Sequence, residues 1–139
     1  FANINLDVDG VRVGPKGIQN YRQTLDMQRA ALTTTFDVGD KVSVSQSLMA
    51  LRHLPFSELT QVSITAKKDC EIIPIAFIES PENLKEVKNF YSEIDRPHAR
   101  IRLLTSVAKS PTGRHTVAAS TSFIFEEPHG QEPEVIHED

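Results

Sequence analysis

Oxygen-bearing side chains alternate near the start of the chain, in the pattern Asn5-x-Asp7-x-Asp9-Gly10. Alternate oxygen ligands before a turning glycine are typical of the opening of a calcium-binding loop. Such a loop needs a bidentate glutamate at its twelfth position, and here that position is Lys16, a cation. We therefore expect a strand that ends in an Asp-Gly turn rather than a calcium site.

Other residues able to do chemistry are few and badly spaced for it. The histidines include no pair at metal-ligand spacing, and the single cysteine allows neither a zinc framework nor an internal disulfide. No serine stands in Gly-x-Ser-x-Gly, and no glycine run precedes Lys-Ser or Lys-Thr. The sequence nominates no catalytic, cofactor-binding or metal-binding residue and predicts no cofactor. The histidines are His53, His98, His115, His129 and His137.

Basic residues form the remaining chemical pattern. His98, Arg100 and Arg102 alternate, so a strand would carry all three on one face. A solvated outer face that blocks edge pairing is one interpretation, and an anion or sugar-phosphate site is the other. Arg22 and Arg29 lie in a hairpin pattern and fit an ordinary surface. A carboxylate pair for sugar hydrolysis depends on a separation that only the fold sets, so the 19 acids nominate none.

Apolar residues recur with a period of two along most of the chain, which predicts strands with one buried face. Short turn sequences separate them and favour antiparallel hairpins. The apolar run 70–78 contains Cys70, expected to be buried and unreactive, and Pro74, which predicts an edge strand or a bulge. We expect an all-β fold, an antiparallel β-sandwich of roughly eight strands. The alternating sets are 32–36, 42–48, 62–66, 101–107 and 117–125.

One segment departs from this period. Ser80 and Pro81 resemble a helix cap and first turn, and apolar residues then follow at helical spacing until Pro97. This pattern predicts one short amphipathic helix over residues 81–95, with Leu84, Val87, Tyr91 and Ile94 on its apolar face.

Length and charge give the organisation of the chain. With 139 residues it has room for one domain, and six of its 19 acids lie in residues 126–139, which contain no Lys or Arg. The nearly neutral body before them argues against nucleic-acid binding, and no apolar stretch is long enough to span a membrane. We predict a β-sandwich domain over 1–125 and an acidic linker or tail over 126–139. Because Phe1 already begins a strand pattern, either a leader was removed or the chain is a piece cut from a longer protein. The acidic run at the other end favours the cut piece, and the compartment stays open.

A hairpin pattern over residues 21–36 carries more specific information. Leu25-Asp26-Met27, a short turn and then Leu32-x-Thr34-x-Phe36 resemble a recurring hairpin in the N-terminal domain of glycoside hydrolase family 65. Taken generously, the resemblance extends to residue 125. That family includes maltose, trehalose and kojibiose phosphorylases and acid trehalases. Ala30 stands where the family usually has a turn glycine, so we expect different dihedrals there.

The resemblance implies a super-β-sandwich similar to galactose mutarotase. In the family this domain precedes a linker and an (α/α)6 barrel that contains the catalytic acid. The chain would then be the non-catalytic N-terminal domain of a glycosidase or phosphorylase acting on α-glucosides. Such a domain packs on the barrel, lends a loop to the rim of the sugar pocket and can contribute to a homodimer.

Three alternatives remain open. A free-standing carbohydrate-binding sandwich usually presents aromatic platforms, and this chain has no Trp and only two Tyr. An enzyme of the mutarotase type would need a carboxylate converging with a histidine such as His98 or His115. An interaction or adhesion sandwich is the third.

Overall fold

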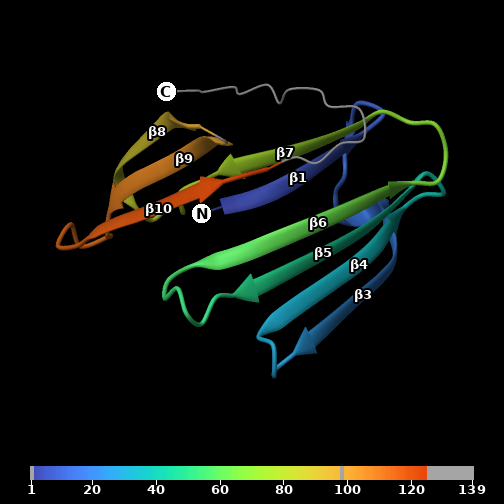
Figure 1. The fold of residues 1–139 in the computed structure, drawn as a ribbon, viewed down its shortest axis with the longest axis horizontal. Helices are drawn as coiled ribbons and strands as arrows, with labels where there is room; N and C mark the ends of the chain where they lie inside the picture. The colour runs from blue at the N-terminus through green and yellow to red at the C-terminus, as the bar shows by residue number, and fades with distance from the viewer. Residues whose placement is uncertain (1, 98, 125–139) are drawn as a thin grey trace. The chain divides into compact units, whose positions relative to one another are not determined.

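A computed structural model describes residues 2–97 and 99–124 of the chain (Figure 1). Apart from one short 3-10 turn at Pro15–Gly17, its regular elements are all strands. They divide into two compact units, Leu6–Ile73 and a second formed by Phe1–Asn5 with Pro74–Asp139. The strands are β1 (Ala2–Val8), β2 (Val11–Arg12), β3 (Ile18–Asp26), β4 (Ala31–Val38), β5 (Val42–Ala50), β6 (Glu58–Ala66), β7 (Ile72–Ile78), β8 (Lys85–Arg96), β9 (Ala99–Lys109) and β10 (Thr116–Ser122).

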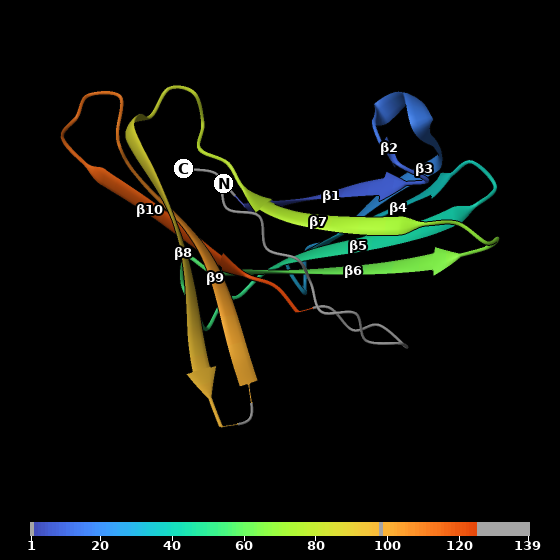
Figure 2. The same ribbon diagram turned by 90° about the horizontal axis from the view of Figure 1, so that it is seen from above.

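Four consecutive strands form the main sheet of the Leu6–Ile73 unit, in the order β3-β4-β5-β6 and all antiparallel (Figures 1 and 2). The register places Phe36 opposite Val44 and Val44 opposite Ile64. Because side chains alternate along each strand, one face of the sheet is apolar and the other polar.

The apolar face packs against the part of β1 that belongs to the same unit. Leu6 and Val8 of β1 join Val42 and Val44 of β5 in one buried cluster. Around it lie partly buried side chains from the sheet, the β2 region and the start of β7. This packing of two layers is a β-sandwich, as the period-two pattern predicts. The surrounding residues are Val13, Phe36, Val38, Val62, Ile64, Cys70 and Ile72.

The strand that contains Pro74 lies at a sheet edge. One of the two three-stranded sheets has the order β2-β1-β7, so β7 is an outer strand of it. A proline has no N–H to donate and is tolerated there. The expected edge position is therefore confirmed. Cys70, just before this strand, is a free thiol that packs beside the buried cluster of its own unit.

The predicted helix over 81–95 is wrong, because residues 85–96 form the long strand β8. This strand pairs with β9, and β9 pairs with β10, in an antiparallel meander with an irregularity between Lys85 and Lys88 (Figure 2). The pairing sets acids of β8 opposite Arg102 and Arg100 of β9. Cross-strand partners thus outweigh a helical spacing that rests on only four apolar residues.

The other predicted strands are confirmed within the described residues. The alternating sets over 32–36, 42–48, 62–66 and 101–107 lie in β4, β5, β6 and β9. The fifth set lies in β10 as far as Ser122, while its last residue, Phe125, is outside the described part. The expected Asp-Gly turn follows β1, with positive φ at Asp9 and Gly10. The acidic segment 126–139 lies outside the described residues, so its boundary stays a prediction.

Candidate functional site

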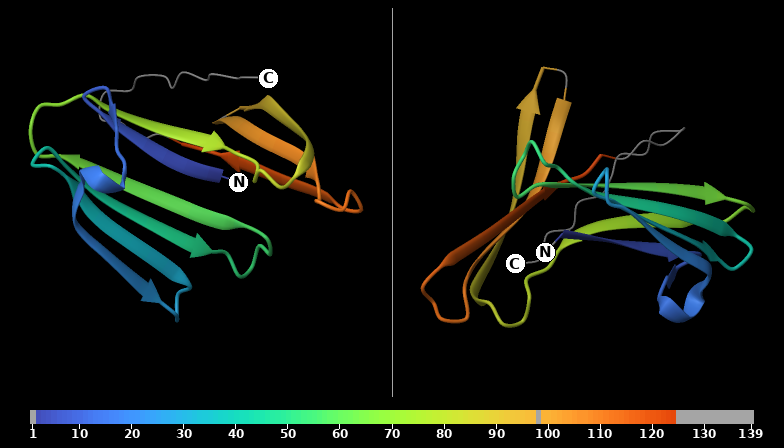
Figure 3. Two further views of the ribbon diagram at one scale, coloured as in Figure 1. Left: turned by 180° about the vertical axis from the view of Figure 1, so that it is seen from behind. Right: turned by 90° about the horizontal axis from the view of Figure 1, so that it is seen from below.

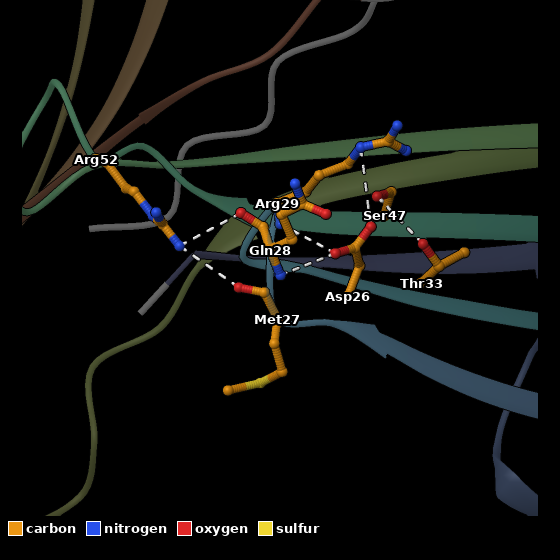
Figure 4. Close-up of polar contacts among 7 residues, drawn as sticks. All are labelled: Asp26, Met27, Gln28, Arg29, Thr33, Ser47 and Arg52. Atoms are coloured by element: carbon orange, nitrogen blue, oxygen red, sulfur yellow. Dashed lines mark hydrogen bonds and ion pairs between the residues drawn. The ribbon is translucent and has the colours of Figure 1, made fainter.

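The turn of the β3–β4 hairpin is organised by the carboxylate of Asp26. The backbone N–H groups of Gln28 and Arg29 both donate to its Oδ1 atom at 3.0 Å (Figure 4). The Arg29 guanidinium adds an ion pair at 3.8 Å. This is the aspartate of the hairpin pattern, and its turn-forming hydrogen bonds explain why an acid follows Leu25 there.

Ala30 closes this turn with a positive φ of 53°. That value lies in the left-handed region that glycine favours, so the expected change of dihedrals is wrong. Its carbonyl accepts a hydrogen bond from the backbone N–H of Ala50 at 3.2 Å, on the neighbouring strand. The sheet thus fixes the backbone of the turn, and Ala30 adopts this conformation at the steric cost that a Cβ atom has there.

The loop between β5 and β6 lies beside this turn, at the same end of the sheet (Figure 3). The Arg52 guanidinium reaches the carbonyl oxygens of Met27 and Gln28, each at 3.5 Å (Figure 4). Within the loop, backbone hydrogen bonds join Leu51 to Ser57 at 3.0 Å and Leu54 to both at 3.1 Å. Two contacts from Arg52 therefore join the loop to the turn, and three backbone hydrogen bonds order the loop itself.

Large apolar side chains are exposed at this end of the sheet. Met27 is 75% exposed and Leu54 52%, and Phe56 is fully exposed. Phe56 also has a positive φ of 66°, an unusual conformation for an aromatic residue. We call Met27, Leu54 and Phe56 the tip surface. Isolated exposed apolar residues need no explanation, but a positive φ at a fully exposed aromatic, at the end of the sheet that also carries Met27 and Leu54, makes this end a candidate functional surface.

The opposite, polar face of the sheet contains a second feature, a hollow of about 370 Å³ that Asp37 helps to line. Lys67 lies 2.7 Å from its carboxylate, Asn20 donates at 2.7 Å, and Ser43 donates as well. Asn20 reaches it because β3 is irregular between Gln19 and Arg22, where Asn20 has a φ of 51°. Most of the lining is hydroxyl-bearing and comes from β4, β5 and β6: Thr35, Ser43, Ser45, Ser63 and Thr65.

These partners decide what Asp37 can do chemically. Hydrogen bonds from Lys67, Ser43 and Asn20 hold the pKa of its carboxyl well below the usual range. A general acid or base needs a pKa near the working pH, so this carboxylate is suited to neither role at neutral pH. Its role is to link three strands of the sheet.

Basic side chains form ion pairs with the two carboxylates of the calcium-like pattern. Asp7 pairs with Arg12, and Asp9 pairs with Lys41. Asp9 also accepts the backbone N–H of Glu71 at 2.9 Å, and these contacts, Lys41 foremost, lower its pKa. Within residues 2–97 and 99–124, the acids, histidines and Cys70 form no cluster of three or more that could hold a metal.

The basic pattern around residue 100 is neutralised across the hairpin. Arg100 lies 3.0 Å from Asp95, and Arg102 lies 3.5 Å from Glu93. Such opposite-charge pairs stabilise a strand pair and leave less charge for an anion. His98 lies outside the described residues, so a three-residue basic face stays a prediction.

The other residues considered from sequence stay apart. In the described part of the chain, no ion pair joins His115 to a carboxylate; its backbone N–H donates to Ser110 at 3.2 Å. Arg22 and Arg29 lie on the exposed hairpin surface, as expected. Sequence reasoning missed Arg52 and Phe56, because neither belongs to the hairpin pattern and the loop brings them beside it.

No known family model matches the chain. Two curated proteins named kojibiose hydrolase do match it. The one from Mucilaginibacter mallensis is 47% identical over 138 residues, and the one from Flavobacterium johnsoniae is 40% identical over 137 residues. Each match covers 99% of this chain and 20% of the relative, so the chain spans about a fifth of the relatives' length. The described residues contain no helix able to span a membrane.

Proposed function

We propose that this chain is the non-catalytic N-terminal β-sandwich domain of a glycoside hydrolase family 65-like enzyme that hydrolyses α-glucosides. The observation that carries the proposal is 47% identity to a kojibiose hydrolase over 99% of the chain but only 20% of that enzyme. At this identity the two segments share a fold, and four fifths of the relative lies outside the match. Catalysis by such an enzyme would then reside in the remainder of the polypeptide.

The contacts of this chain's acidic residues favour a structural role over a catalytic one. The most interconnected carboxylate, Asp37, is held ionised by Lys67, and Asp9 is engaged by Lys41. In the described residues, the acids that form hydrogen bonds or ion pairs serve turns, strand pairing or inter-strand links. The hairpin pattern of Leu25, Asp26 and Leu32 gives an independent resemblance to the family.

The organisation that we propose follows the family. Residues 1–125 form the sandwich, and the acidic segment 126–139 leads toward an (α/α)6 catalytic barrel in the same polypeptide. The match runs over 138 residues and so extends into this acidic segment. Kojibiose, an α-linked glucose disaccharide, is the substrate that we propose for the whole enzyme, with hydrolysis rather than phosphorolysis as the reaction.

The decisive experiment compares the 139-residue chain with the complete polypeptide of its gene. Each is incubated with kojibiose, maltose or trehalose, and released glucose is measured. We expect release from kojibiose by the complete polypeptide and none by the chain alone. Glucose released by the purified chain, or a gene without a long segment after residue 139, would overturn the proposal.

Calorimetry separates this proposal from a free-standing carbohydrate-binding module. Titration of the chain with kojibiose should give only the heat of dilution, because the described surface presents no aromatic platform from Trp. Saturable heat would favour the binding module instead.

A further inference from the structure

The three apolar side chains of the tip surface are exposed to solvent in the described part of the chain. Met27 and Leu54 are mostly exposed, and the ring of Phe56 is entirely in solvent. Each apolar side chain in water is unfavourable compared with a buried one. Three of them on one turn and one loop at the same end of the sheet form a surface that burial would stabilise.

The backbone at this end has positive φ angles and is tied by hydrogen bonds. Phe56 has a φ of 66° and Ala30 one of 53°, although neither is a glycine. The hydrogen bonds from Leu54 to Leu51 and from Ser57 to Leu54, both 3.1 Å, hold the Phe56 conformation. A rigid presentation lowers the entropy lost when the side chain is buried by a partner. A positive φ at a fully exposed aromatic residue, held by the hydrogen bonds of its loop, motivates a functional hypothesis for this position.

Polar groups around the tip surface are already satisfied or remain at its margin. Arg52 donates to two backbone carbonyls, and Asp26 accepts two backbone N–H groups. Arg29 stays 84% exposed beside them. An apolar centre with a charged margin is the usual arrangement of a protein interface, with an aromatic residue as its anchor.

We propose that the tip surface docks on the remainder of the same polypeptide, with Phe56 as the anchor. This inference rests on the proposed function, because it names the surface through which the domain would pack. The occupant follows from length: the matched relatives are about five times as long as this chain, which matches them over 99% of its residues. A covalently attached partner is also present at high effective concentration, so a small surface is enough.

The test uses the complete polypeptide with a specific protease site inserted between residues 126 and 139. After cleavage, size-exclusion chromatography reports whether the domain stays with the remainder. We expect co-elution for the unsubstituted protein and dissociation for Phe56→Ser, with at least about a tenfold weaker association. Val11→Ser is the matched control, because Val11 is 68% exposed and lies on β2, and it should co-elute.

A second variant separates docking from folding. Phe56→Gly relieves the positive φ, so the domain should unfold at an equal or higher temperature, yet it removes the anchor and should dissociate. Co-elution of both Phe56 variants would overturn the inference, as would dissociation of the unsubstituted protein. A Phe56-dependent dimer of the released domain would also overturn it, by identifying a second copy as the partner. Kojibiose hydrolysis is assayed in parallel, so that failure of the proposed function is seen independently of elution.

Discussion

Asp37 and Ala30 show how single residues hold the main sheet together. Asp37 receives donors from the irregular part of β3, from β5 and from the residue after β6, so one carboxylate connects three segments. Ala30 completes the tight turn between β3 and β4 at a backbone conformation that costs an alanine energy. Substitution of either residue should therefore change the stability of the domain.

Replacing Ala30 by glycine should stabilise the domain. The left-handed conformation costs a non-glycine residue about 1–2 kcal/mol, and glycine loses about 0.5–1 kcal/mol of extra chain entropy on folding. We therefore expect Ala30→Gly to raise the free energy of unfolding by about 0.5–1 kcal/mol in urea denaturation. Ala66→Gly on β6, which lacks a positive φ, is the control and should destabilise. A loss of stability in Ala30→Gly would contradict the strain argument.

Asp37→Asn should destabilise the domain in a pH-dependent way. The pKa of Asp37 is lowered by folding, chiefly through Lys67, so its stabilising contribution is present above the ordinary pKa of about 4 and is lost as the pH falls below it. The melting temperatures of the two proteins should differ most near neutral pH and converge in acid. Glu58→Gln, on the same sheet, controls for removal of one charge. A difference that stayed constant from neutral to acid pH would contradict the prediction.

At the scale of elements, most strands could be predicted from sequence, whereas β8 could not. Phe36, Val44 and Ile64 alternate with polar residues, and this period alone identifies the buried face of the main sheet. Tyr91 and Ile94 fit a helix and a strand equally well, so their local spacing could not decide. The acids at 93 and 95 and the arginines at 100 and 102 were the available signal, because they can pair only across a hairpin.

A charge exchange on β8 and β9 tests that hairpin. Asp95→Arg and Arg100→Asp should each destabilise the domain, and the double variant should recover about 0.2–1 kcal/mol relative to the sum of the two. Asp95→Arg combined with Arg29→Asp, in the other unit, should be additive. Free energies of unfolding from urea titrations give the coupling. Additivity of the Asp95 and Arg100 variants would argue against the pairing.

The tip surface illustrates why a site is harder to predict than a strand. Phe56 is one of seven phenylalanines, and nothing in its neighbourhood distinguishes it from a core residue. Its exposure and positive φ arise from the hydrogen bonds of a loop, which depend on the chain path between β5 and β6. The hairpin pattern did indicate the adjacent turn, because Asp26 has a local role that sequence spacing reveals.

At the scale of the whole molecule, burial is concentrated in one of the two units. Among the described residues, Leu6, Val8, Val42 and Val44 are the buried apolar side chains of the Leu6–Ile73 unit. Among the described residues of the other unit, only Ala108 and the hydroxyl-bearing Ser106 are buried, and Ser106 shares a hydrogen bond with Ser80 at 2.6 Å. The β8–β10 meander thus has strand pairing but little apolar burial of its own.

Amide hydrogen exchange should reveal the difference in apolar burial between the two units. In the isolated chain, amides of β8 and β9 should exchange at least about tenfold faster than those of β5, because a local opening of the meander exposes little apolar surface and so costs less by ~1.4 kcal/mol or more. In the complete polypeptide the same amides should slow toward the rate of β5 if the remainder of the polypeptide buries Phe90 and Ile101, which are 48% and 38% exposed here. Equal protection of β5 and β9 in the isolated chain would show that the meander is stable alone. In that case the meander would not need the remainder of the polypeptide for its stability, and the proposed docking would rest on the tip surface alone.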